Sequence, residues 1–118
     1  MVKISGQAKI MRIYIGEASK YKGALLYHAI VVKAKELGLA GATVFRGLEG
    51  YGANSRIKTS RILSLSVDLP VVIEIVDSTE YLDKIMPFLD EAVTEGMITL
   101  EDVEVFRYTP KQPQEKFV

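Results

Sequence analysis

Four stretches of the chain have the alternation or apolar character of β-strands, and two have the spacing of amphipathic helices. In the first half, Ala8–Ile15 is rich in β-branched and aromatic residues and predicts a strand. After a polar loop over Gly16–Gly23, apolar residues recur at helical spacing over Leu26–Leu37, and Gly38 is placed to end that helix. Gly41–Gly47 then predicts a second strand.

The second half of the chain repeats this order. The apolar run that ends Leu65–Val76 predicts a third, more buried strand. A helix follows, with Asp77 or Ser78 as its N-terminal cap and Gly96 at its end. Val103–Tyr108 predicts the fourth strand. The element order is therefore β-α-β, a loop, and β-α-β.

Two such units commonly form a four-stranded antiparallel sheet with both helices on one face. We therefore predict an α+β fold, namely a ferredoxin-like α/β sandwich built as a double βαβ. A length of 118 residues fits one domain, which we place at residues 1–108. Residues 109–118 contain two prolines and few core candidates, and are predicted to form a loose C-terminal tail.

Both faces of this predicted sheet are partly apolar, because the strands have apolar residues at consecutive positions. The consecutive residues are Ile10-Met11, Val44-Phe45, Val71-Val72-Ile73 and Val105-Phe106. A sheet face that meets water normally shows a cleaner alternation. We therefore expect the face without helices to be covered, most simply by other copies of the chain.

Charged residues interrupt the same strands. In the usual strand order 4-1-3-2 the first strand is central, so Arg12 is predicted to reach both Glu74 and Glu104 across the sheet. Three interpretations are open at this point. The charges form a solvated surface ladder of little energetic weight, an ion-pair cluster at a subunit interface, or a catalytic group.

Composition narrows the function classes. Lys and Arg together number 15, as do Asp and Glu, so the formal net charge is zero, which argues against a general nucleic-acid or membrane-surface binder. The absence of cysteine excludes disulfides and thiolate chemistry. His28 is the only histidine, so a zinc site is not expected. No secretory segment or membrane-spanning run is evident, and a cytoplasmic protein is predicted.

The long connection between the two halves is the strongest functional candidate. Residues 48–64 are predicted to form a flexible loop, and long loops in compact domains are usually functional or disordered. The 46–61 segment has a charge of +3, because it contains four basic residues (Arg46, Arg56, Lys58 and Arg61) and one acidic residue (Glu49). Glycine amides and Arg or Lys side chains can together hold an anion, although a mobile hairpin explains the glycines equally well. The candidate ligand-binding residues are Arg46, Gly47, Gly50, Tyr51, Gly52, Arg56, Lys58 and Arg107.

Several stretches of the sequence resemble a known family. They are AKIMRIYIGE, KYKGALLYHAI, GLAGATVFRGLEGYG and DLPVVIEIVD. These resemble the domain-of-unknown-function family 190, whose members look like relatives of the PII signalling proteins. The resemblance covers about Lys3 to Tyr108.

The resemblance implies a homotrimer with its sheets facing inward, adenine nucleotides bound in clefts between subunits, and a loop that touches target proteins. One feature departs from the PII pattern. PII proteins hold phosphates with a glycine- and lysine-containing loop, whereas the corresponding Glu95–Thr99 has one glycine and no basic residue. A nucleotide site is therefore expected to use Arg46, the Gly47–Gly52 backbone and Arg107.

The sequence thus leads to a non-enzymatic, PII-like homotrimeric regulator that binds a small anionic ligand, best matched by an adenine nucleotide, and contacts a partner protein through the 48–64 loop. No resident cofactor or metal is expected. The alternative is a small enzyme that acts on a phosphorylated or carboxylate metabolite, with Glu49, Glu74 or Glu104 as its acid or base. A nucleic-acid binder that uses the basic loop is a third possibility, disfavoured by the zero net charge.

Overall fold

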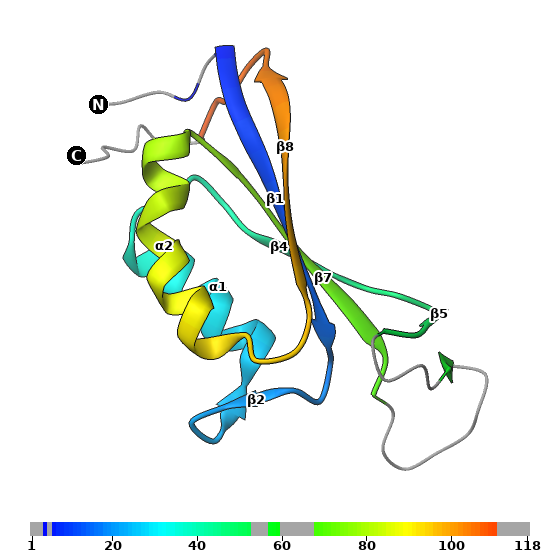
Figure 1. Cartoon of the computed structure of the whole chain (residues 1–118). Helices are drawn as coiled ribbons and strands as arrows, with labels where there is room; N and C mark the ends of the chain where they lie inside the picture. The colour runs from blue at the N-terminus through cyan, green and yellow to red at the C-terminus, as the bar shows by residue number, and fades with distance from the viewer. Residues whose placement is uncertain (1–3, 5, 53–56, 60–67, 111–118) are drawn as a thin grey trace.

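A computed structural model of the protein describes residues 4, 6–52, 57–59 and 68–110. Within these residues, four longer strands and two helices form the body of the molecule (Figure 1). They are β1 (Gly6–Gly16), α1 (Leu26–Glu36), β4 (Thr43–Arg46), β7 (Pro70–Asp77), α2 (Thr79–Ala92) and β8 (Met97–Val105). Two small ladders are formed by β2 (Lys20–Tyr21) with β3 (Ala24–Leu25), and by β5 (Glu49–Gly50) with β6 (Lys58–Thr59).

The four longer strands form one antiparallel sheet in the order β4-β7-β1-β8. This is the predicted strand order, with β1 hydrogen-bonded on both sides. Both helices cover the same face of the sheet (Figure 1). The ferredoxin-like α+β fold is therefore confirmed. In the described part of the chain, no helix is long and apolar enough to cross a membrane.

The core lies between the helices and one face of the sheet. Alternate residues of β1 and β7 point into it, which is the period-two pattern of a strand with one covered face. Its fully buried side chains include Met11, Ile13, Ile30, Ile73, Ile75, Ile85 and Leu89. α1 ends as predicted, because Gly38 adopts φ 79° after the last turn and donates its N–H to the carbonyl of Lys35.

The structure shows which of the two predicted residues, Asp77 or Ser78, caps the N-terminus of α2. Ser78 is the N-cap, and its side chain accepts a hydrogen bond from the backbone N–H of Tyr81 at 3.3 Å. Asp77 is instead fully buried, and its carboxylate accepts the backbone N–H groups of Ala40 at 2.8 Å and Ser78 at 2.7 Å. Asp77 therefore joins the segment before β4 to the segment before α2.

Two local predictions from the sequence were wrong. The fourth strand spans Met97–Val105 rather than Val103–Tyr108, because its pairing partner β1 is long enough to take it from Tyr14 back to Gly6. The predicted polar loop at Gly16–Gly23 contains part of the β2–β3 ladder, whose turn has positive φ at Lys22 and Gly23. Two positive-φ residues in succession are typical of a type I′ hairpin turn.

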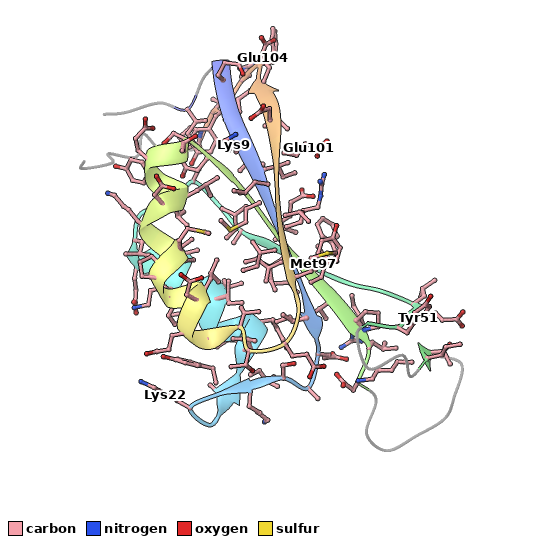
Figure 2. All side chains as sticks on the ribbon, in the orientation of Figure 1. Lys9, Lys22, Tyr51, Met97, Glu101 and Glu104 are labelled. Atoms are coloured by element: carbon pink, nitrogen blue, oxygen red, sulfur yellow. The ribbon has the colours of Figure 1, made fainter. Side chains whose placement is uncertain are left out.

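The sheet face without helices has its side chains in rows that run across the strands. One row is apolar and consists of Phe45, Val72, Tyr14 and Met97. The next row is polar and consists of Thr43, Glu74, Arg12 and Thr99. Figure 2 shows Met97 and Glu101 on this side, away from the helices. We refer to this surface as the open face.

Arg12 is the centre of an ion-pair cluster on the open face. Its guanidinium binds Glu74 at 3.2 Å and Glu101 at 2.8 Å. The prediction that Arg12 also reaches Glu104 was wrong, because the register of β8 places Glu104 opposite Gln7. The hydrogen bond to Glu101 is the largest influence on Arg12 and helps to raise its pKa above the usual value. Arg12 is therefore charged throughout the physiological range.

The turn from α2 into β8 depends on Gly96. This residue has φ 148°, and a Cβ atom there would overlap the carbonyl oxygen of Tyr14 and lie 3.0 Å from Cγ2 of Ile15. We expect Gly96→Ala to lower the free energy of unfolding by about 2 kcal/mol or more, because it adds backbone strain and a steric clash. Urea denaturation followed by circular dichroism measures this change.

Gly52→Ala is the matched control, because a Cβ atom at Gly52 meets nothing within 4 Å and its φ is not positive. We expect that variant to change stability by at most about 0.5 kcal/mol. Equal stability of the two variants would contradict the steric argument for Gly96.

Candidate functional site

Those predicted ligand-binding residues that the structure describes fall into two groups at opposite ends of the sheet. Arg46 ends β4 and lies opposite Val71, near the end of β1. Arg107 follows β8, whose last residue pairs with Gly6 at the beginning of β1. The eleven residues of β1 separate these ends by about 30 Å. One copy of the chain therefore does not bring Arg46 and Arg107 together.

At the first end, which we call the loop end, Asp68 connects three segments. Its Oδ1 accepts the backbone N–H of Ala18 at 2.7 Å, and its Oδ2 pairs with the ammonium group of Lys58. Arg46 pairs with Glu17, whose own backbone N–H donates to the carbonyl of Leu69 at 2.8 Å. The base of the 48–64 loop is thus attached to the turn after β1.

Burial raises the pKa of Asp68, but the hydrogen bonds from Lys58 and Ala18 outweigh it. The net effect is a pKa below the ordinary carboxyl value. Asp68 is therefore ionised at neutral pH and available to pair with Lys58.

Two of the predicted glycines permit close packing at the loop end. The N–H of Gly47 donates to the carbonyl of Pro70 at 2.7 Å. A Cβ atom on Gly47 would lie 2.9 Å from Cγ of Pro70, and one on Gly50 would lie 3.2 Å from the same atom. These glycines hold the loop base against the first residue of β7. Gly52 has no such contact.

The described part of the 48–64 loop presents apolar side chains to solvent. Leu48 is 79% exposed, Tyr51 is 71% exposed and Ile57 is 62% exposed. Figure 2 shows Tyr51 on the loop end, away from the body of the domain. Arg56 and the predicted tail residues 111–118 lie outside the described residues.

The other end of the sheet, the pocket end, has a cavity of about 300 Å³. It is bordered by the segment before β4, by β7 and by the segment after β8. Its walls include Ala40, Thr43, Glu74, Val76, Arg107 and Tyr108. The hydroxyl of Tyr108 donates to the carbonyl of Ala40 at 3.1 Å, which ties the segment after β8 to the segment before β4.

The pocket end combines apolar walls with a few groups that can orient a ligand. Arg107 Nε donates to Thr109 Oγ1 at 2.9 Å, an arrangement that fixes the guanidinium close to the pocket. Thr43 and Glu74 add a hydroxyl and a carboxylate. Mixed walls of this kind suit a small organic ligand with an anionic group. Among the described residues, no group of three His, Asp or Glu is placed to hold a metal ion.

The sequence could not have identified Glu17, Asp68 or the pocket as parts of a site. Glu17 has the sequence context of a solvated turn, and Asp68 has no motif around it. Asp68 meets Ala18 across 50 residues of sequence, and Tyr108 meets Ala40 across 68. Such contacts follow from the strand order and leave no periodic signal.

The low pKa of Asp68 makes the loop end sensitive to acid. A carboxyl group whose pKa is lowered in the folded state stabilises that state fully above its unfolded pKa of about 3.9, and this contribution is lost as the pH falls below that value. We expect carboxyl-carbon NMR titration to give Asp68 a pKa below about 3.9, and Lys58→Met to raise it. An unchanged pKa in Lys58→Met would contradict the pairing.

Comparison with known proteins agrees with the geometry. The family model DUF190, described as Uncharacterized ACR, matches residues 8–105. A UPF0166 protein of Aquifex aeolicus is 44% identical over 99 residues, which is 82% of this chain and 91% of that protein.

Two solved structures share the fold. One is CPII, a nitrogen regulatory PII-like protein from Thiomonas intermedia bound to ADP, AMP and bicarbonate, with a TM-score of 0.59, 20% identity, and coverage of 86% of this chain and 90% of that one. The other is a PII-like chain from Thermus thermophilus, with a TM-score of 0.61, 22% identity, and coverage of 86% and 91%. The chain belongs to the DUF190 family and has the fold of PII-like proteins.

Proposed function

We propose that this protein is a PII-like homotrimeric regulator that acts in the cytoplasm and binds an adenine nucleotide between its subunits. The observation that carries the proposal is the separation of the two candidate cation groups. Arg107 borders a pocket at one end of the sheet, and Arg46 lies at the other end. A ligand that uses both arginines needs the pocket end of one copy and the loop end of another.

The open face supports assembly. Phe45 is 51% exposed and Met97 is 55% exposed, although both belong to an apolar row that crosses all four strands. Burying such a row against other copies removes apolar surface from water, at about 25 cal/mol per Å². The Arg12 ion pairs beside it offer a means of fixing the orientation of the copies.

The pocket supports a nucleotide. Its apolar walls can accept a planar base, and arginine binds phosphate oxygens in a bidentate manner. CPII, which has the same fold, was solved with ADP and AMP bound, and we extend that ligand class to this chain as part of the proposal. The 48–64 loop begins beside Arg46, so a ligand at the loop end is positioned to change how the loop meets a partner protein.

The alternative of a small enzyme has no support from the arrangement of its carboxylates. Glu49 lies in β5 at the loop end, Glu74 is bound by Arg12, and Glu104 lies near the opposite end of the sheet. Of these three, only Glu74 lines the pocket, and there it is engaged in an ion pair with Arg12. A regulatory function therefore accounts for more of the geometry.

The nucleotide proposal is tested by calorimetric titration with ATP, ADP, AMP and cyclic nucleotides. We expect micromolar binding of at least one of them by a trimer. Arg46→Ala and Arg107→Ala should each weaken it about 10-fold or more, because each removes a charged hydrogen bond. Lys35→Ala, which removes an exposed cation from α1, is the control and should bind like the parent.

A trimer that binds none of these nucleotides would refute the ligand. Binding that survives both arginine substitutions would refute the site, even with the ligand correct.

Assembly through the open face is tested with Phe45→Asp. The parent should have a mass by light scattering of three times the 13.1 kDa of the chain. The variant places a charge in the apolar row, and it should shift toward the monomer while its circular dichroism is unchanged. Val32→Asp, at an exposed position on the helical layer, should stay trimeric. A trimeric Phe45→Asp would show that the open face is not the interface.

A further inference from the structure

The two described cations of the loop end are already paired with carboxylates. Arg46 binds Glu17 from the turn after β1, and Lys58 binds Asp68 from the segment before β7. By sequence, the 46–61 segment has an excess of three positive charges. In the folded chain, part of that excess is neutralised by residues from outside the segment.

The Asp68 carboxylate and the Glu17 backbone are held in place independently of the cations that these residues bind. Asp68 Oδ1 accepts the N–H of Ala18 at 2.7 Å, and the oxygen lies 3.0 Å from the position of a Cβ on Gly16, so glycine makes room for it. The main chain of Glu17 is fixed by its N–H, which donates to the carbonyl of Leu69. Arg46, by contrast, comes just before the 48–64 loop, and Lys58 lies within it, in β6.

The exposure of the four groups shows which partner a ligand can reach. The side chain of Arg46 is 63% exposed, whereas that of Glu17 is 18% exposed. Lys58 is 41% exposed and Asp68 is 33% exposed. A dissolved anion can therefore reach Arg46 more easily than Glu17, and Lys58 is also partly open to it.

We propose that Glu17 and Asp68 are internal competitors of the ligand: they occupy Arg46 and Lys58 in the empty protein, and an anionic ligand binds by displacing them and thereby frees the base of the 48–64 loop. This inference rests on the proposed function, because it concerns the same anionic ligand. It specifies how binding is coupled to the loop. By linkage, a change that weakens the two ion pairs increases the affinity for the ligand by the same factor.

Conservative amide substitutions separate this competition from structural effects. Asp68→Asn keeps Oδ1 as the acceptor for Ala18 and removes only the charge that binds Lys58. Glu17→Gln leaves the backbone bond to Leu69 intact and provides a second variant should Asp68→Asn fold poorly. Asp90→Asn is the control: it also removes one negative charge, but at an exposed position on α2, away from the loop end.

Calorimetry with ADP gives the first result. We expect Asp68→Asn and Glu17→Gln each to tighten ADP binding by up to about fivefold, the range of a partly exposed ion pair, and Asp90→Asn to leave it unchanged. Unchanged or weaker binding in both loop-end variants would overturn the proposal, and it would do so without affecting the nucleotide-binding result for the parent.

A tryptophan at position 57 gives a readout that needs no nucleotide. The chain has no tryptophan, and Ile57 is exposed directly before β6, so Ile57→Trp introduces a single tryptophan next to Lys58. In that background, Glu17→Gln with Asp68→Asn should lower the fluorescence anisotropy of the free protein. In the Ile57→Trp variant with both carboxylates intact, pyrophosphate or ADP should lower the fluorescence anisotropy toward the same value.

If no adenine nucleotide binds to the parent or to any variant, the proposed ligand is wrong, and the anisotropy comparison with pyrophosphate still decides the competition. The proposal of internal competition would be overturned if the anisotropy changed neither with the carboxylate substitutions nor with pyrophosphate.

Discussion

The whole structure depends on the pairing of β1 with two strands at once. Its eleven residues form antiparallel ladders with β7 on one side and β8 on the other. Because successive side chains of a strand point to opposite faces, β1 assigns Met11, Ile13 and Ile15 to the core and Arg12 and Tyr14 to the open face. The helices then have only one face to cover. A slip of one residue would exchange these roles, so the register fixes both the core and the open face.

The same strand sets the distance between the two candidate ligand groups. Its length places the loop end and the pocket end at opposite extremes of the sheet. The pocket of about 300 Å³ reaches along the sheet only as far as Thr43, so a ligand that fills it must extend past the rest of β4 to meet Arg46 within one chain. Assembly and ligand binding are therefore parts of one hypothesis.

The sequence predicted those features that arise from local pattern. The fold, the strand order and the end of α1 at Gly38 follow from periodicity and from glycine chemistry, and the structure confirms them. The start of β8 was missed because its acidic residues Glu101 and Asp102 looked like a solvated surface. In the structure they are tolerated in an edge strand, where they pair with Arg12 and Lys9 across the sheet. A register between distant strands cannot be read from either strand alone.

Charge counting along the sequence had a similar limit. It gave the loop segment an excess of positive charge, and it favoured a ligand or partner attracted to free cations. The folded chain supplies Glu17 and Asp68 to two of these cations, while Leu48, Tyr51 and Ile57 extend into solvent. In the described part of the loop, the side chains open to a partner are thus mainly apolar, and the cations are already engaged. A protein partner that docks on this surface would gain from apolar contact, whereas an anion would gain only by competing with carboxylates that the fold holds in place. The two kinds of binding make different demands on the loop end, and that difference is what would allow a ligand to alter the recognition of a partner.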